Sequence, residues 1–523
     1  MHFIYKLTFL NSNYCKRSFF NSPDKLKKLN FFKNEDKKFM NEIRVRYAPS
    51  PTGYIHIGNL RTALYNYLFA RNQKGKFIVR IEDTDRTRFV PGAVENMINT
   101  LKWAGLDYDE GPYIGGDFGP YYQSERLDIY AGHAEELIKN KKAYYCFCTP
   151  ERLASLREEQ QKKGEQTMYD KKCLHLSEDE ISENLKNGVP YVIRMNIEHG
   201  QKVKFTDYIR GEVEFSTDLI DDQILIKTDK FPTYHFANIV DDHLMKISHV
   251  IRGEEWLPST PKHVLLYRSF GWETPVFAHL PLLLNPDRTK LSKRQGDVAV
   301  EDYKNKGYLR EALINFIALL GWTAGDDKEF YESLSELTEK FSLDRVNKSG
   351  AVFDMEKLKW LNEEHLRIKS SAELTAMLRE ELKNSKYAGI DFTDEYLAEV
   401  IQAMLPRVSF IREIYQKGFY FFEEPAEYEE AAVKKRWKEN SADILKKFSE
   451  KLIAAENPSK EEIEAMVHSL AEEMNISTGN IIHPLRLATT GVSGGPGIYD
   501  IIYIIGKEKT INRINRITEK LKK

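Results

Sequence analysis

Two short segments carry residues suited to holding a nucleoside triphosphate. His56-Ile57-Gly58-Asn59 precedes a stretch of helical periodicity, and Lys290-Leu291-Ser292-Lys293-Arg294 forms a basic loop followed by Gly296. Backbone N–H groups and the dipole at a helix N-terminus attract phosphate. Lysines on a loop can stabilise the negative charge that develops as pyrophosphate leaves. Each segment alone is weak evidence, because basic loops are usually solvated surface.

A third group of residues has the spacing of a metal site. Cys146-x-Cys148 is followed, after 24 intervening residues, by Cys173-x-His175. Three thiolates and one imidazole complete a tetrahedral zinc site with no open position, so the ion would be structural. The alternative is a set of buried, inert cysteines. We expect a zinc ion that folds the segment around it and takes no part in chemistry.

Composition limits the classes of protein. The chain has 523 residues, of which 41% are apolar and 30% charged, and its net charge is −2. It is long enough for three or four domains of about 150 residues each. No run approaches the ~20 apolar residues of a membrane span, and four cysteines are too few for a secreted disulfide framework of this length. We expect a soluble, cytoplasmic protein whose nucleic-acid contacts, if present, come from local basic patches.

Residues 1–39 differ from the rest of the chain. They are rich in Phe, Lys and Asn, and they contain no Ala, Gly or Val. The stretch lacks the cleavage site of a signal peptide and the arginine-rich pattern of a transit peptide. We interpret it as a non-native or disordered extension, with Met40 as the true start.

The elements after residue 40 predict an α/β fold. Residues 43–48 alternate as a strand, the stretch from Leu60 to Gly75 has helical periodicity, and residues 77–81 form a second apolar strand. A right-handed strand–helix–strand unit places His56 at the carboxyl edge of a parallel sheet, where nucleotides bind. The fold class is therefore α/β with a Rossmann-type sheet.

The rest of the chain divides into three further parts. Residues 125–235 look like an insertion with a charged helix around 151–163, and sheet-like sequence returns over 223–251, before a helix near 261–270. From about residue 309 the chain reads as helical. We predict a catalytic domain over 40–365 and a helical domain over 366–523.

Taken together, the motifs resemble those of the class I aminoacyl-tRNA synthetases, whose two signatures read roughly HIGH and KMSKS. The fourth residue of the first is Asn59 here, which still offers a donor. Several segments are similar to the bacterial-type glutamyl-tRNA synthetases, including the RxAPSPTG opening. These are residues 46–53, 81–85, 119–124, 232–238, 241–243, 250–256 and 494–496.

This resemblance implies a glutamate–tRNA ligase. Glutamate would react with Mg·ATP to give glutamyl-adenylate and pyrophosphate, and the glutamyl group would pass to the terminal adenosine of tRNA-Glu. His56, Lys290 and Lys293 would carry the catalysis through the triphosphate. The expected ATP-binding set is His56, Gly58, Glu255, Leu283, Lys290, Leu291, Ser292, Lys293 and Arg294, with Leu283 acting through its backbone.

The resemblance also implies a binding site for glutamate. Arg46 and Arg252 are suited to carboxylates, because a guanidinium binds them through two hydrogen bonds. Glu82 would pair with the ammonium group, and the remaining members would supply neutral contacts. The full set is Arg46, Ala48, Ser50, Glu82, Tyr234, Asn238 and Arg252. The alternative is that Arg46 and Glu82 pair with each other or with solvent.

The resemblance implies that the helical C-terminal part binds the anticodon of the tRNA. It also implies that the protein is a monomer and does not contact a membrane. Positive charge comes from Arg407, Arg486, residues 434–436 and the tail 507–523. Arg407 is our candidate anticodon contact. Residues 419–422 are aromatic, and we interpret them as helix core in place of base-stacking platforms.

Four other functions fit parts of the sequence. A glutaminyl-tRNA synthetase is disfavoured by the opening motif and the helical C-terminal part. A truncated relative that modifies a queuosine base of tRNA lacks that part altogether. A non-catalytic RNA-binding paralogue predicts damaged signatures, yet His56, Lys290 and Lys293 are present. A small nucleotidyltransferase does not need this length or the second motif.

Overall fold

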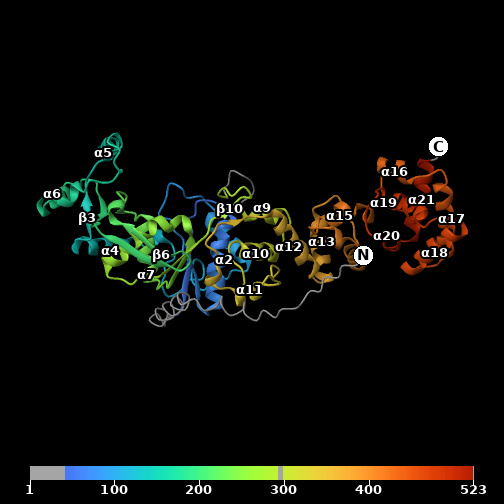
Figure 1. The fold of residues 1–523 in the computed structure, drawn as a ribbon, viewed down its shortest axis with the longest axis horizontal. Helices are drawn as coiled ribbons and strands as arrows, with labels where there is room; N and C mark the ends of the chain where they lie inside the picture. The colour runs from blue at the N-terminus through green and yellow to red at the C-terminus, as the bar shows by residue number, and fades with distance from the viewer. Residues whose placement is uncertain (1–41, 292–298, 522–523) are drawn as a thin grey trace, which may run out of the picture.

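The computed structural model describes residues 42–291 and 299–521. The molecule is elongated, with α5 (Pro150–Lys162) and α6 (Glu178–Lys186) at one end (Figure 1). Helices of the C-terminal part lie at the other end, and the predicted sheet lies between them. The predictions made for residues 1–39 and for Ser292, Lys293 and Arg294 fall outside the described residues.

The central sheet has six strands, of which five are parallel. Its order is β2 (Lys76–Val79), β1 (Arg44–Tyr47), β8 (His249–Gly253), β9 (Val276–Leu280), β5 (Lys202–Asp207) and β6 (Gly211–Ser216). Only β6 is antiparallel, because it returns from β5 as a hairpin. The predicted strand–helix–strand unit is confirmed as β1, α2 (Ile57–Asn72) and β2, with Val45 opposite Phe77. The α/β fold class is therefore confirmed.

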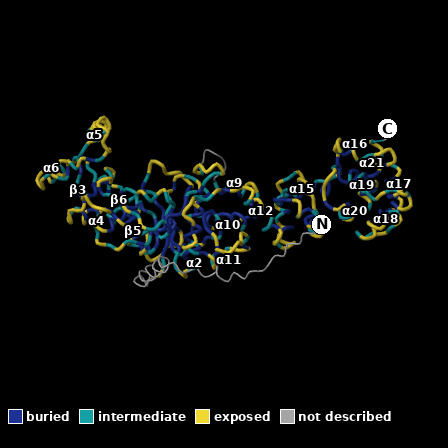
Figure 2. The backbone as a smooth tube through the Cα atoms, in the orientation of Figure 1, coloured by how far each residue is buried: buried dark blue, intermediate teal, exposed yellow. Residues whose placement is uncertain are grey.

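The main core forms where α2 packs between this sheet and later helices. Leu60, Leu64 and Leu68, one helical turn apart, are fully buried there. Figure 2 shows buried backbone concentrated around the sheet and α10 (Arg310–Leu319), whereas α5 and α6 are mostly exposed. The other elements of this part are α3 (Ala93–Ala104), α8 (Thr260–Phe270), β10 (Leu283–Leu284), α9 (Val300–Asn305), α11 (Leu334–Lys340) and β11 (Ala351–Val352).

The segment expected as one insertion, 125–235, divides between two sheets. A separate antiparallel sheet contains β3 (Ala143–Cys146), β4 (Val192–Met195) and β7 (Ile224–Ile226), beside α4 (Leu127–Lys139). The hairpin β5–β6 instead extends the central sheet, because Asp207 pairs beside Phe277. The expectation of sheet throughout 223–251 is wrong. The helix α7 (Tyr234–Leu244) lies there, since its buried residues recur at helical spacing.

The C-terminal part is helical apart from its turns, as expected. It contains α12 (Met355–Arg367), α13 (Ser371–Lys383), α14 (Asp394–Met404), α15 (Glu413–Lys417), α16 (Glu430–Arg436), α17 (Ser441–Ala454), α18 (Lys460–Glu473), α19 (Gly479–Thr490), α20 (Ile498–Ile505) and α21 (Lys507–Lys520). Two apolar clusters meet at α20. Tyr420, Phe421 and Phe422 are buried, which confirms their interpretation as core. Among the described residues, no helix has the length and apolar character to cross a membrane.

Candidate active site

One cavity at the carboxyl edge of the central sheet contains every residue predicted to bind glutamate. Its volume is about 760 Å³. Strand β1 and the loop after it supply one wall, α7 supplies another, and the end of β8 supplies a third. The predicted residues that line it are Arg46, Ala48, Ser50, Glu82, Tyr234, Asn238 and Arg252.

Buried ion pairs organise the charged side of this cavity. Arg46 Nε donates to Asp242 at 3.1 Å, and Arg80 donates to Asp242 at 2.8 Å and to Glu82 at 2.9 Å. Asn238 donates to the same Glu82 oxygen, Oε1, at 3.0 Å. The alternative in which Arg46 pairs with Glu82 is therefore not what the structure contains. Burial raises the pKa of Glu82, and its partners, Arg80 first, oppose that effect.

Sequence reasoning assigned no role to Arg80 and Asp242. Arg80 is fully buried and contacts both Asp242 and Glu82. The signal was available, because an arginine inside an apolar strand is rarely buried without acidic partners. Arg80 lies two residues before Glu82 and just outside the segment 81–85, so the motif did not single it out. Both residues set the charge distribution that Arg46 and Glu82 present to the cavity.

The aromatic side of the cavity contains Tyr234 and a second residue that sequence reasoning did not single out. The ring of Trp256 lies 4.4 Å from that of Tyr234, centroid to centroid, and both residues line the cavity. Burial raises the pKa of Tyr234 to about 12, so its hydroxyl keeps its proton at neutral pH. This side therefore offers two aromatic rings and one neutral hydrogen-bond donor, the hydroxyl of Tyr234.

A smaller cavity of about 230 Å³ adjoins the first. The predicted ATP-binding residues among the described part of the chain line it, namely His56, Gly58, Glu255, Leu283, Lys290 and Leu291. Asn59, Thr62, Gly253 and Glu255 line both cavities. The two cavities therefore adjoin at these four residues, and a molecule bound in one would lie next to a molecule bound in the other.

His56 occupies the N-cap of α2, as the sequence predicted. Its Nδ1 accepts a hydrogen bond from the Gly58 backbone N–H at 3.0 Å, so the proton of a neutral ring lies on Nε2. The chain after the second signature returns to the first, since Val300 N–H donates to the carbonyl of Ile55, the residue before His56, at 3.1 Å. Lys290 is placed by a bridge to Leu284 in β10. Of the described residues on either side of 292–298, Lys290 lines the smaller cavity together with His56, and Ala299 forms a bridge to His56.

Three of the four predicted metal ligands lie together. The sulfur atoms of Cys146, Cys148 and Cys173 are all within 4.8 Å of one another, and none of these cysteines is in a disulfide. His175 is exposed and is not part of this group. The hydroxyl of Tyr169 lies 3.4 Å from Cys148 Sγ and accepts from the Cys173 backbone N–H at 2.9 Å. The phenol oxygen therefore faces the thiol group.

The C-terminal part contains a compact basic surface. Arg486 is largely buried, and its Nη1 has no hydrogen-bond partner among the described residues. Burial lowers the pKa of Arg486, and Arg407 adds to that effect. Burial also lowers the pKa of His483, and the positive charges of Arg436 and Lys435 add to that effect. Several of the basic residues predicted from the sequence, at 407, 435–436 and 486, therefore lie close to one another.

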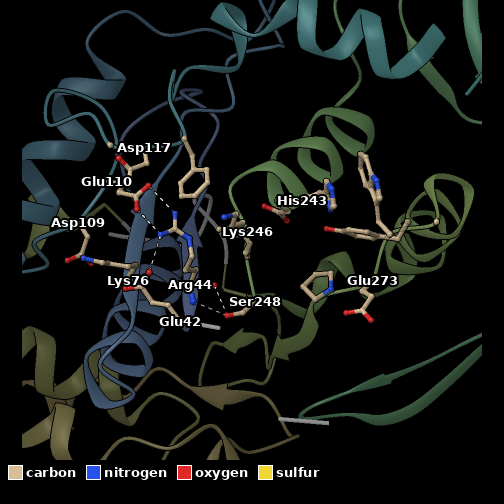
Figure 3. A pocket seen from close by; sticks show the side chains of 18 residues that line it. Glu42, Arg44, Lys76, Asp109, Glu110, Asp117, His243, Lys246, Ser248 and Glu273 are labelled. Carbon is tan, nitrogen blue, oxygen red and sulfur yellow. Dashed lines mark hydrogen bonds and ion pairs between the residues drawn. The ribbon is translucent and has the colours of Figure 1, made fainter. Parts of the chain in front are cut away.

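Another cavity, of about 940 Å³, lies at the opposite edge of the sheet (Figure 3). None of the predicted site residues lines it. Figure 3 shows Arg44 pointing toward Glu110, to which it donates two hydrogen bonds of 2.7 and 3.0 Å. In open parallel sheets ligands bind at the carboxyl edge. This cavity lies at the amino edge, and the ion pair between Arg44 and Glu110 forms part of its wall.

Comparisons with known proteins agree with this geometry. Residues 42–360 match the model for the catalytic domain of class I tRNA synthetases (E and Q), and residues 373–518 match an anticodon binding domain. The glutamate–tRNA ligase of Chloroherpeton thalassium is 53% identical over 494 residues, covering 92% of this chain and 98% of the relative. That of Chlorobium chlorochromatii is 52% identical, covering 91% and 97%.

Solved structures give the same result. A glutamate tRNA ligase from Elizabethkingia meningosepticum, in complex with its amino acid, has a TM-score of 0.88 at 41% identity, covering 92% of this chain and all of the other. The enzyme from Elizabethkingia anophelis has a TM-score of 0.85 at 40% identity. Two adjoining cavities at the carboxyl edge, a helical C-terminal part and these relatives establish that the chain belongs to the class I tRNA synthetases, among the glutamate–tRNA ligases.

Proposed function

We propose that this chain activates L-glutamate with ATP and transfers the glutamyl group to tRNA-Glu. The observation that carries the proposal is the shared wall between the two cavities, formed by Asn59, Thr62, Gly253 and Glu255. Glutamate in the larger cavity would have its α-carboxylate beside the α-phosphate of ATP in the smaller one. Such positioning supplies much of the catalysis in phosphate chemistry.

The larger cavity matches the charges of an acidic amino acid. Arg252 Nη1 is buried without a hydrogen-bond partner among the described residues, and it suits the side-chain carboxylate together with Arg46. Glu82 suits the ammonium group, because both of its protein hydrogen bonds fall on Oε1. A glutamine side chain would leave a buried guanidinium facing an amide, which is a weaker partner.

The smaller cavity accounts for the phosphate chemistry. His56 Nε2–H would donate to a phosphate oxygen, and the N-terminus of α2 would add its dipole. Lys290 and, by resemblance, Lys293 would hold the charge that develops on the leaving pyrophosphate. ATP would enter as its magnesium complex, which shares that charge. The 2′-hydroxyl of the terminal adenosine would then attack the adenylate, as in other class I enzymes.

Three thiolates in one group fit a zinc ion, which would fold the segment that approaches the acceptor end of tRNA. They leave one coordination position. We assign it to the Tyr169 oxygen in place of His175, because the oxygen lies at the group and His175 does not. Residues 40–365 would thus bind the acceptor end and the small substrates, and 366–523 the anticodon.

The first experiment is transfer of labelled glutamate to purified tRNA-Glu and tRNA-Gln. We expect charging of tRNA-Glu by the full chain with Mg·ATP, and none by Arg252→Ala at the same glutamate concentration. Glutamine and aspartate serve as competing substrates. Absence of charging of either tRNA with glutamate, with active tRNA supplied, would contradict the proposal. Charging of tRNA-Gln as well would extend the substrate to a second tRNA.

A further inference from the structure

A chain of buried polar groups runs behind Arg252, on the side away from the glutamate cavity. Arg252 in β8 lies directly opposite His279 in β9, and its Nε donates to His279 Nε2 at 3.1 Å. His279 Nδ1 lies 2.6 Å from the carboxylate of Asp207, the last residue of β5. Asp207 and His279 are fully buried, and Arg252 is 5% exposed.

The contacts fix which atoms carry hydrogen. A carboxylate at 2.6 Å requires the His279 proton to be on Nδ1. Nε2 of the neutral ring is then an acceptor, which is what the Arg252 Nε–H needs. Burial lowers the pKa of His279; the hydrogen bond to Asp207 acts against that effect, the guanidinium of Arg252 adds to it, and the pKa lies below its ordinary value. The ring is therefore neutral and has one tautomer.

The rest of the guanidinium is held on the same edge. Arg252 Nη2 donates to Thr260 Oγ1 at 3.0 Å and lies 3.3 Å from His263 Nδ1. The Nε and Nη2 positions are thus occupied by protein acceptors. Nη1 alone has no hydrogen-bond partner among the described residues. Arg252 consequently has one orientation, with Nη1 left for a ligand in the cavity that it lines.

We propose that Asp207 and His279 are positioning residues for glutamate recognition, acting through Arg252. Neither lines the glutamate cavity. Asp207 selects the His279 tautomer, and His279 holds the Arg252 guanidinium at the angle that receives the substrate carboxylate. The inference deepens the proposed function and rests on it. The orientation of Arg252 in β8 would depend on the carboxylate of Asp207 in β5, two strands away in the sheet.

The surroundings of Asp207 make one substitution decisive. Its other oxygen, Oδ1, accepts from the backbone N–H groups of Ile209 at 3.0 Å and Arg210 at 2.8 Å. In Asp207→Asn these two donors retain the amide oxygen, so the NH₂ group must face His279 Nδ1. Nδ1 must then accept from that NH₂ group, so the ring proton moves from Nδ1 to Nε2, and two N–H groups face each other between His279 and Arg252.

The test is the steady-state kinetics of D207N in the full chain with tRNA-Glu. We expect the KM for glutamate to rise about tenfold or more, the loss of one charge-assisted hydrogen bond, while the KM for ATP stays within about twofold. The matched control is Asp222→Asn. Asp222 is also buried, and it accepts from Tyr144 at 2.6 Å in β3, which belongs to the separate antiparallel sheet. It should leave the KM for glutamate unchanged.

Two further variants separate positioning from packing. His279→Gln keeps an acceptor for Arg252 and has no tautomer, whereas His279→Phe removes the acceptor. We expect H279F to raise the KM for glutamate severalfold more than H279Q, and D207N to have little effect when added to H279Q. The comparison of H279F with H279Q tests the positioning role of His279 even if D207N does not fold.

Three results would overturn the inference alone. These are an unchanged KM for glutamate in folded D207N, an equal rise in both KM values, or equal effects of H279F and H279Q. Absence of charging by the unaltered chain would overturn the proposed function and this inference with it.

Discussion

At the scale of single residues, the glutamate cavity depends on charges that are buried before any ligand enters. Arg46, Arg80, Glu82 and Asp242 are all at most 3% exposed. Moving such groups out of water costs free energy unless each is paired. The two cations and two anions balance one another, and the buried guanidinium atom without a protein hydrogen bond among the described lining residues is Nη1 of Arg252.

Glu82 gives a prediction about pH. Its pKa is raised by burial, so it takes up a proton at a higher pH than an exposed glutamate does. We expect the KM for glutamate to rise as the pH falls through that raised pKa, because the protonated acid cannot pair with the ammonium group. In Glu82→Gln the KM should be about tenfold higher at neutral pH and should lose this dependence.

The measurement is initial rates across the acidic range, with Asp83→Asn as the neighbouring control. The linkage to folding has the opposite sign. The folded state binds this proton more tightly than the unfolded state, so the contribution of Glu82 to stability is present at low pH and falls as the pH rises. A rate profile identical in E82Q and the unaltered chain would contradict the assignment.

Gly58 gives a prediction about ATP. A Cβ atom there would lie 2.9 Å from His56 Cε1 and 3.1 Å from Nδ1. Gly58→Ala must therefore displace the imidazole that caps α2 and donates toward phosphate. We expect the KM for ATP to rise about tenfold and the KM for glutamate to change little. Gly132→Ala, which has nothing within 4 Å, is the control. Equal kinetics in both variants would contradict the role of His56.

Residue types and spacing were enough to predict the two signatures and the glutamate set, and the structure places their described members around two adjoining cavities. Asp207, His279 and Asp242 could not be predicted in the same way. Their roles come from pairing across strands that are far apart in the sequence, as between Asp207 and His279. The tautomer of His279, in particular, depends on its distance from Asp207, and the residue types alone do not reveal that distance.

At the scale of elements, the errors follow from local ambiguity. Residues 234–244 contain apolar side chains on one face and were interpreted as sheet, yet they form α7. The hairpin β5–β6 was assigned to the insertion, because nothing local shows that its edge pairs with β9. The helical character of the C-terminal part was predicted correctly, and the structure adds local detail such as the capping box of Ser459 and Glu462 at the start of α18.

The cysteine group gives a prediction at this scale. Tyr169→Phe should lower the zinc content measured by elemental analysis or weaken zinc retention against a chelator about tenfold or more, because one coordination position is lost. His175→Ala should retain zinc, since the residue lies outside the group. Cys148→Ser is the positive control. Full retention in Y169F with loss in H175A would reverse the assignment of the fourth ligand.

At the scale of the whole molecule, the small-substrate cavities lie at the central sheet, whereas the basic residues around Arg486 in α19 lie among the helices at one end of an elongated chain (Figure 1). We expect Arg486→Gln to raise the KM for tRNA about tenfold and to leave glutamate and ATP KM values unchanged. The test is charging at two salt concentrations, with Lys446→Gln as an exposed control. A change in the KM for ATP would contradict this separation.

The elongated shape has a consequence for how one tRNA is selected. In the proposed function, once the acceptor end had bound at the insertion, the anticodon would meet the far surface as an intramolecular event, at a high effective concentration. The two contacts then multiply, and neither needs to be tight by itself. A single wrong base at the anticodon removes the second contact and returns the complex to the weak affinity of the first. Release of the correct, charged tRNA can begin at either end, which keeps turnover compatible with selectivity.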